Sequence, residues 1–368
     1  MLKTVKARDY LFDNYKAFLM IMVVVGHFIQ PCYDNNPFLY VLKYFIYAFH
    51  MPAFVFVSGY FSKKDISWSK ALQKMLIPYL AFQVIYCVYY TYGLDINTAW
   101  RLSFPKFSLW YLLALFVWKI ITPWVRKIPH YFWISLIVSV VFGCFEVKGT
   151  YFSVSRILVF YPYFLAGMFF DKNKITELRT RKNRIISILG MSVYVVFAAV
   201  FAKPLEFRLS YFYGKESYAS LGQGNWEGIW TRLLCYAIGF FFIYALMVLM
   251  TEKQTVFSKL GSKTMPVYLF HGLLFKFFEH KTSIIEMVNT LPETVVLLAF
   301  CVSLVFVFSL EPFCRFVDLF SNVTFRTFKK EAILSAAATF LQYENSTVYT
   351  IRKQPKYKNW NMQDVRAS

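Results

Sequence analysis

Long apolar runs, each interrupted by only a few polar residues, repeat along most of the chain. A helix needs about 20 such residues to cross a hydrocarbon core about 30 Å thick. Ten runs approach this length, near 15–32, 38–61, 75–93, 108–125, 130–146, 151–170, 185–203, 229–250, 264–281 and 293–316. The pattern predicts an all-α integral membrane bundle of about ten transmembrane helices over 15–316, between a short N-terminal segment, 1–14, and a basic tail, 317–368.

The orientation of this bundle follows from the Lys and Arg residues between the runs. With the N-terminus inside, the cytoplasmic segments hold eighteen of them and the outer segments seven. Cytoplasmic loops carry such an excess of positive charge. We therefore predict cytoplasmic N- and C-termini and a multi-pass protein of the cell membrane, the cytoplasmic membrane of a bacterium.

Composition narrows the function classes. Hydrophobic residues make up 58% of the 368 residues, more than a soluble protein could cover with polar surface. The formal net charge of +20 lies in short basic clusters between apolar runs, which fits contact with anionic membrane lipids and not nucleic acid. The six cysteines are scattered without metal-ligand spacing, so we expect neither a disulfide framework nor a metal site.

The first run contains two ionisable residues, Lys16 and His27. His27 comes eleven positions after Lys16. On a helix the two side chains therefore point in directions that differ by only about 20°, and they lie about 16 Å apart along the axis. We expect Lys16 at the cytosolic mouth and His27 about half-way across the membrane. An ionisable side chain at that depth indicates a functional site. The structural alternatives are a packed histidine bonded to a carbonyl and a lysine that extends to the headgroups.

Further polar residues fall within other runs. His50 is expected near the middle of the second run, two residues before Pro52, and the small Ser58-Gly59 pair that follows predicts a close helix approach. His271 lies about 10 Å along the ninth run. Arg156, in the sixth, needs a partner or a substrate anion if it is buried, whereas Arg232, near the outer end of the eighth, could extend outward. The aromatic residues of the loop 204–228 suit either a sugar ring or, as we expect, the headgroup region.

Several stretches together resemble the membrane-bound acyltransferase family three, and within it the fucose 4-O-acetylase type. The two main ones are 13–27, whose spacing from Lys16 to His27 is similar to the family's pattern of a basic residue, ten residues and a histidine, and 49–61. Weaker matches are 109–112, 160–167 and 260–271. The resemblance implies a ten-span enzyme that moves an acyl group, usually acetyl, from coenzyme A to a hydroxyl of a cell-envelope carbohydrate.

The resemblance would make His27 the essential histidine and Lys16 its basic partner, a lysine where many members have arginine. The residues agree with this chemistry, because a buried neutral imidazole is a competent general base for a sugar hydroxyl. We assign His27 and His50 to catalysis. His50, Arg156 or tyrosine hydroxyls could donate to the oxyanion, and direct transfer and an acyl-histidine relay both stay open.

The remaining assignments concern binding. Lys16 and Arg156 are expected to bind the donor, acetyl-CoA as co-substrate, and Trp110 and His271 to contact the carbohydrate acceptor, which could be lipid-linked. The rival hypothesis is a transporter or flippase of lipid-linked sugars, which would also line a central path with His and Arg. Inverted internal repeats would favour that rival, and none is visible in the sequence.

Overall fold

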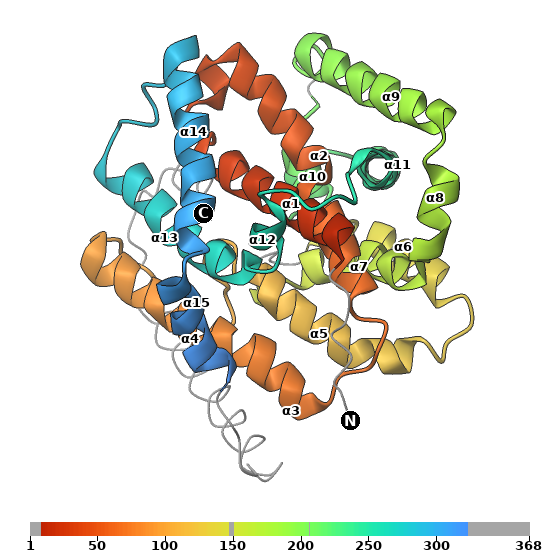
Figure 1. Ribbon diagram of the computed structural model, residues 1–368, viewed down its shortest axis with the longest axis horizontal. Coiled ribbons are helices and arrows are strands. Elements are labelled where there is room, and N and C mark those ends of the chain that lie inside the picture. Colours follow the sequence, from red (N-terminus) through yellow and green to blue (C-terminus); the bar gives the residue numbers. More distant parts are fainter. Residues whose placement is uncertain (1–8, 147–150, 206, 323–368) are drawn as a thin grey trace.

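The computed structural model describes residues 9–146, 151–205 and 207–322, and within these ranges every regular element is helical. Figure 1 shows α1 and α2 near the centre of the bundle, with α6 and α9 at one side and α13, α14 and α15 at the other. The long helices are α1 (Tyr10–Phe28), α2 (Pro37–Tyr60), α5 (Trp110–Val125), α6 (Tyr131–Phe142), α7 (Val154–Phe169), α9 (Arg181–Val200), α11 (Asn225–Leu249), α13 (Thr264–Lys281), α14 (Leu291–Phe308) and α15 (Glu311–Ser321).

Shorter helical segments complete the bundle. One continuous helical stretch runs from α3 (Trp68–Ala71) through a π-helical turn, Leu72–Leu76, into α4 (Ile77–Val88) and a second π-helical turn, Tyr89–Gly93. Three one-turn helices lie in connections, α8 (Ile175–Leu178), α10 (Ser210–Tyr213) and α12 (Ser258–Gly261).

Seven helices are long and apolar enough to cross a membrane. They are Tyr10–Phe28, Pro37–Tyr60, Trp68–Gly93, Tyr151–Phe169, Arg181–Val200, Asn225–Leu249 and Leu291–Phe308. Helices also lie over the other three predicted runs, but α5 and α6 are shorter, and α13 contains the charged residues Lys276, Glu279 and Lys281. The all-helical prediction is confirmed for the described residues, and seven of the ten predicted spans meet the length and hydropathy that a crossing requires.

The limits of α1 place His27 near the end of its helix. Asp9 caps the helix by accepting a hydrogen bond from the backbone N–H of Phe12, so α1 begins at Tyr10. It ends at Phe28, shortly before Pro31, which disfavours helical geometry in the residue preceding it. His27 is therefore the penultimate residue of α1, and its depth about half-way across the membrane stays a prediction.

The last predicted run, 293–316, is two helices and not one. α14 ends at Phe308, and α15 begins at Glu311 with Pro312 in its first turn, where a proline is tolerated. α15 continues to Ser321, past the predicted start of the tail at 317. The rest of the predicted tail, 323–368, lies outside the described residues.

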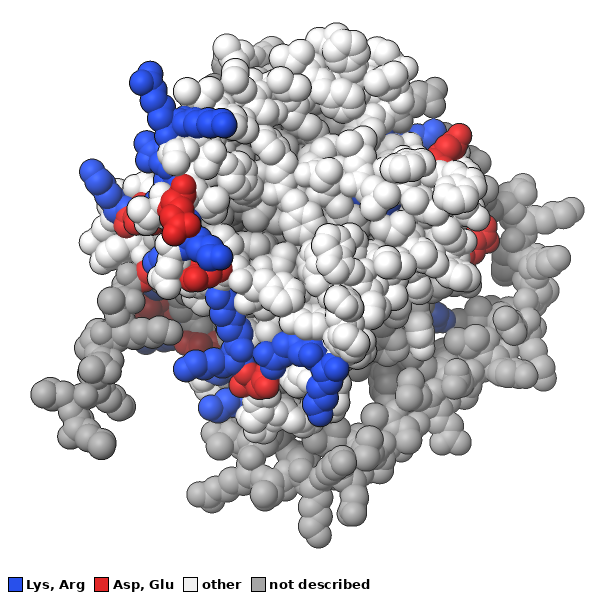
Figure 2. Space-filling view, turned by 90° about the vertical axis from the view of Figure 1, so that its right-hand side faces the viewer, with Lys and Arg blue, Asp and Glu red and all other residues white. Residues whose placement is uncertain are grey.

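Burial separates the central helices from the peripheral ones. In α1 and α2, 72% of the most apolar window is buried inside the bundle, but in α9 only 17% is. The exposed side of α9 carries Ile188, Leu189, Val193 and Val196. Figure 2 shows the side of the molecule that includes α9: charged side chains gather toward its two edges, and the middle is without charge. Such a band is typical of a surface in contact with lipid.

α2 and α7 cross in direct backbone contact. A Cβ atom on Gly59 would lie 1.9 Å from the carbonyl oxygen of Phe164, and one on Gly167 would lie 1.9 Å from that of Phe56. Only glycine fits at either position, because any side chain would push the helices apart. The close approach predicted at Ser58-Gly59 is confirmed.

The bundle has two ends, which we name after residues of α1. At the Lys16 end, Asn14 Nδ2 donates to the carbonyls of Thr251 (3.0 Å) and Lys253 (2.8 Å), and Lys172 pairs with Asp9 at 2.7 Å. At the His27 end, Tyr44 donates to the carbonyl of Phe207 (2.6 Å), and Lys281 pairs with Asp95 at 2.6 Å. Segments that the charge count assigned to one side of the membrane thus contact one another.

Candidate functional site

His27 lies in a small cluster of rings at its end of the bundle. Its imidazole centroid is 4.6 Å from that of Phe107, 5.4 Å from that of His271 and 6.2 Å from that of Phe275. The side chain is half-buried, and neither of its nitrogens has a hydrogen-bond partner among the described residues. Both nitrogens of His27 are therefore open to a substrate.

His271 presents a buried acceptor atom next to His27. Its Nδ1 lies 3.0 Å from the carbonyl oxygen of Val267, and because a carbonyl can only accept, Nδ1 must carry the proton. The neutral ring then has an unprotonated Nε2, which is buried and has no hydrogen-bond partner among the described residues. A buried acceptor left unpaired is costly, so this atom is suited to a proton donor that arrives with a substrate.

His50 has the same arrangement on α2. Its Nδ1 lies 2.9 Å from the carbonyl of Ile46, so Nδ1 donates there, and the ring packs edge-on against Tyr47 with centroids 4.8 Å apart. A neutral His50 therefore offers an acceptor and no free donor. The predicted donation to an oxyanion fits Arg156 or a tyrosine hydroxyl better than His50.

Phe107 belongs to a loop, and no pattern in the sequence points to it as a site residue. It has a φ of 47°, in the left-handed region, and its ring contacts both His27 and His271 (5.5 Å). Gly272 on α13 makes room for it, since a Cβ there would lie 2.3 Å from Phe107 Cδ1. A strained backbone thus holds an aromatic ring against the two histidines.

Arg156 and Trp110 form a second group of predicted site residues, in contact with each other. Arg156 lies in the first turn of α7, is half-buried, and donates from Nε to the carbonyl of Tyr213 at 3.4 Å. Its guanidinium carbon lies 5.0 Å from the centroid of the Trp110 ring, and Trp110 also packs against Phe160 at 5.3 Å. The indole is buried beneath the cation.

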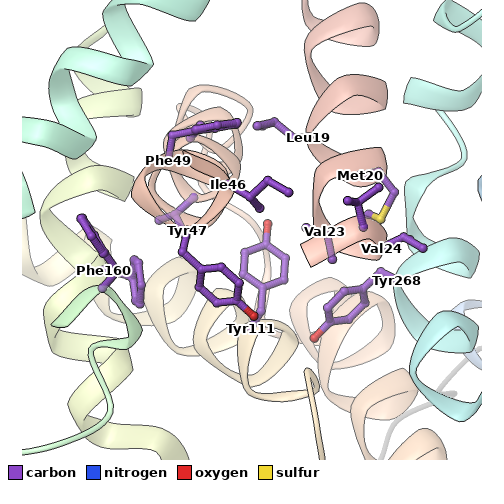
Figure 3. Close-up of a cluster of buried hydrophobic side chains, with 14 of the residues drawn as sticks. Leu19, Met20, Val23, Val24, Ile46, Tyr47, Phe49, Tyr111, Phe160 and Tyr268 are labelled. Carbon is purple, nitrogen blue, oxygen red and sulfur yellow. The ribbon is translucent and has the colours of Figure 1, made fainter. Parts of the chain in front are cut away.

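Tyrosine side chains contact the histidines and lie near the pair of Arg156 and Trp110. Tyr47 contacts His50 and Tyr213 (5.2 Å), and it lies close enough to Arg156 for electrostatic interaction. Tyr268 lies 5.7 Å from Tyr111 and 6.4 Å from His271, centroid to centroid. Figure 3 shows Tyr47, Tyr111 and Tyr268 gathered between Val23 and Val24 of α1 on one side and Phe160 of α7 on the other. The structure therefore brings together five of the six predicted site residues, His27, His50, Trp110, Arg156 and His271.

Lys16 lies apart from the other five. It is eleven residues before His27 on the same continuous helix, a rise of about 16 Å. Its ammonium pairs with Asp13 at 3.0 Å and lies 5.2 Å from the centroid of the Phe61 ring. The side chain is 20% exposed, so the ion pair remains within reach of a ligand at the Lys16 end.

Lys43 is a buried cation that the sequence prediction missed. The residue is 1% exposed, and its Nζ lies 3.6 Å from the centroid of Tyr33 and 5.7 Å from that of Tyr47. It is close enough to His27 for electrostatic interaction. A cation-π contact is worth about 2 kcal/mol when desolvated, whereas a lysine at the centre of a membrane helix costs roughly 2.5–3.5 kcal/mol. The available signal was a lysine inside the apolar run 38–61.

Arg232 and the loop 204–228 also differ from expectation. Arg232 is 4% exposed and donates from Nη1 to the carbonyl of Tyr211 at 3.1 Å, so the outward-extending arrangement considered for it is wrong. Phe212 and Tyr218 of the loop are buried rather than placed at the surface, while Trp226 is 76% exposed. The hydrogen bonds to the loop's carbonyls hold it onto the bundle, which explains the difference.

Two ionisable side chains outside the spanning helices, Cys32 and Lys215, have pKa values shifted by their burial. Burial raises the pKa of the Cys32 thiol to about 11. Burial, and then the nearby guanidinium of Arg156, lower the pKa of Lys215, although Glu216 opposes this.

Across the described ranges, no group of three or more His, Cys, Asp and Glu side chains is placed to hold a metal ion.

Comparison with known proteins identifies the family. Residues 9–310 match the family model of an acyltransferase domain, which covers most of the chain and ends at the break between α14 and α15. The chain belongs to this acyltransferase family. The predicted family is thus confirmed, for a chain with seven helices long and apolar enough to cross a membrane. No solved structure matches it.

Two relatives carry the name nodulation protein NolL. The protein from Sinorhizobium fredii (strain NBRC 101917 / NGR234) is 27% identical over 219 residues, which cover 53% of this chain and 57% of that protein. The protein from Mesorhizobium japonicum (strain LMG 29417 / CECT 9101 / MAFF 303099) is 40% identical over 62 residues, 16% of this chain and 17% of that protein. The longer match spans a little over half of its relative.

Proposed function

We propose that the protein is an O-acetyltransferase that moves an acetyl group from acetyl-CoA to a hydroxyl of a cell-envelope or exported carbohydrate, with His27 as general base. Family membership supports acyl transfer. The observation that supports the role of His27 is its position beside His271, whose ring centroid lies 5.4 Å away and whose Nε2 is a buried acceptor; neither nitrogen of His27 has a hydrogen-bond partner among the described residues.

The proposed step needs one proton acceptor and one site for the oxyanion. A neutral His27 nitrogen takes the proton of the sugar hydroxyl as its oxygen attacks the thioester carbonyl carbon. The tetrahedral intermediate collapses, the carbon–sulfur bond breaks, and the thiolate of coenzyme A takes the proton from the His27 imidazolium. Arg156 or a tyrosine hydroxyl donates to the oxyanion, because neutral His50 and His271 have no free N–H.

The substrates are proposed to approach from different ends. Lys16 binds the phosphates or amide carbonyls of acetyl-CoA at the Lys16 end, about 16 Å from His27 along α1, and Arg156 binds the donor's inner part. His271, through its unpaired Nε2, and Trp110 bind the carbohydrate acceptor, which could be lipid-linked.

The proposed topology has ten crossings with both termini in the cytosol of a bacterial cell. Short or polar helices can cross when neighbouring helices cover them, and α13 is such a case because His271 and Phe275 are buried. The contacts among segments at each end support the alternation that ten crossings require.

The proposal is tested by acetyl transfer in membrane vesicles that contain the full chain. Vesicles are supplied with acetyl-CoA labelled in the acetyl group, and label in carbohydrate and lipid fractions is measured. We expect transfer with the parent chain and with His130→Asn, an exposed histidine at the start of α6 whose left-handed φ asparagine tolerates, but not with His27→Ala. Movement of a lipid-linked sugar without consumption of acetyl-CoA would instead establish the transporter.

A further inference from the structure

Two cations at the His27 end have no carboxylate within ion-pair distance among the described residues. Lys43 lies over the rings of Tyr33 and Tyr47 and makes no ion pair or hydrogen bond with any described residue, although Asp34 acts on it from further away. Arg156 donates to one carbonyl, and no described carboxylate lies within ion-pair distance of it, although Glu216 acts on it from further away. Lys276, which also acts electrostatically on His27, differs, because Glu279 pairs with it at 2.5 Å.

These two cations both lie near the ring of Tyr47. That ring lies 5.7 Å from Lys43 Nζ and also interacts with Arg156, and it contacts His50. Lys43 acts electrostatically on His27, and Arg156 covers Trp110. The cations therefore lie beside the residues proposed for catalysis, each near the first turns of its helix, α2 or α7.

We propose that Lys43 and Arg156 form a phosphate-binding site beside His27. A phosphate ester carries up to two negative charges and several acceptor oxygens, which matches two cations without a described carboxylate within ion-pair distance and the adjacent tyrosine hydroxyls. The proposal rests on the proposed function for the identity of the phosphate. It belongs either to the sugar-bearing lipid of the acceptor or to coenzyme A.

Binding to the purified full-length chain in lipid nanodiscs tests the site without measuring turnover. Thermal unfolding is followed with two pairs of probes, farnesyl phosphate against farnesol, and coenzyme A against pantetheine, which lacks the phosphates. A ligand that binds the folded chain raises its unfolding temperature. We expect protection by the phosphate-bearing member of one pair and not by its neutral counterpart. If farnesyl phosphate protects and farnesol does not, the phosphate belongs to the lipid of the acceptor. If coenzyme A protects and pantetheine does not, the phosphate belongs to the donor.

Substitutions decide whether the two cations are responsible. In Lys43→Met and in Arg156→Met, half-maximal protection by the phosphate probe should need at least a tenfold higher concentration. Lys203→Met removes an exposed cation that lies over Tyr40 at the same end and should leave protection unchanged. Lys43→Met should also unfold at the parent temperature or above it, because an unpaired buried charge is replaced by an apolar chain of similar length.

The outcomes separate this site from the proposed function. A Lys43→Met chain that is protected like the parent in both pairs overturns the site, as does one that unfolds at a lower temperature with unchanged phosphate affinity, since Lys43 would then be structural. His27→Ala should keep phosphate protection while losing acetyl transfer. Suppose that the parent transfers no acetyl group, and that phosphate protection is present in the parent but lost in both cation variants. The phosphate site then stands and the acetyltransferase proposal fails.

Discussion

The rings of His27 on α1 and His271 on α13 lie with centroids 5.4 Å apart, and they are not equivalent. His271 is fixed through Nδ1 to the carbonyl of Val267, whereas His27 has no hydrogen-bond partner among the described residues. A side chain that must take up and release a proton needs such freedom, and one that orients a substrate needs fixed geometry. This difference supports the proposal that His27 carries the proton and that His271 holds the substrate in a fixed orientation.

The first prediction separates these roles. His27→Ala should lower turnover by about 100-fold or more with little change in donor binding, because the lost interaction forms only in the transition state. His271→Phe preserves the ring packing against Phe107 but lacks Nε2, and it should mainly raise the KM for the acceptor, by about tenfold. Steady-state kinetics in vesicles measure both. Near-normal turnover in His27→Ala would falsify the base assignment.

Lys16 should affect the donor and not the chemistry. Lys16→Ala should raise the KM for acetyl-CoA with kcat nearly unchanged, and Lys16→Arg should retain part of the affinity, since the ligand meets a positive charge in either case. Asp13→Asn removes the ion-pair partner of Lys16 and should not weaken the binding of acetyl-CoA. If Lys16→Glu binds acetyl-CoA as well as the parent does, Lys16 has no role at the donor.

Topology can be tested independently of activity. Reporter fusions after Ser62 and after Asp171 should read cytoplasmic, and a fusion in the loop 204–228 should read exterior, because of the eighteen-to-seven asymmetry of basic residues. Fusions on each side of α13 test the most polar of the proposed crossings. An exterior result at Asp171 would exclude the ten-span arrangement.

The sequence predicts the helices well because hydropathy is a local property. Helices lie over all ten apolar runs, and the glycine contact between α2 and α7 followed from two small residues in sequence. Helix ends were less accurate, since α1 starts at a capping aspartate outside the run and stops before Pro31. His27 is therefore the penultimate residue of α1, although the predicted run continues to residue 32.

The candidate site was only partly predictable, because it depends on contacts between distant segments. The resemblance selected His27, but nothing local in the sequence could place His271 or Phe107 beside it. The protonation of His271 follows from a carbonyl one turn earlier, which only the structure reveals. Lys43 was overlooked because basic residues were counted in loops, whereas this one is buried inside a helix.

Phe107 offers the last prediction, which concerns water. Its ring packs against His27, His271 and Phe275, and its left-handed φ is a conformation that costs about 1–3 kcal/mol, so the surrounding contacts must hold it there. A ring in this position covers part of His27, the proposed general base, against solvent. Water that reaches His27 would compete with the sugar hydroxyl for the thioester.

Phe107→Ala should therefore raise acetyl-CoA hydrolysis in the absence of acceptor by several-fold, and it should lower the fraction of acetyl groups that reach carbohydrate. Phe107→Leu keeps most of the apolar volume and should hydrolyse little, which makes it the matched control. Release of free thiol, compared with label incorporated into carbohydrate, measures the two fates in one assay. Equal hydrolysis in the alanine and leucine variants would show that the ring does not exclude water, and its strained backbone would then need another explanation.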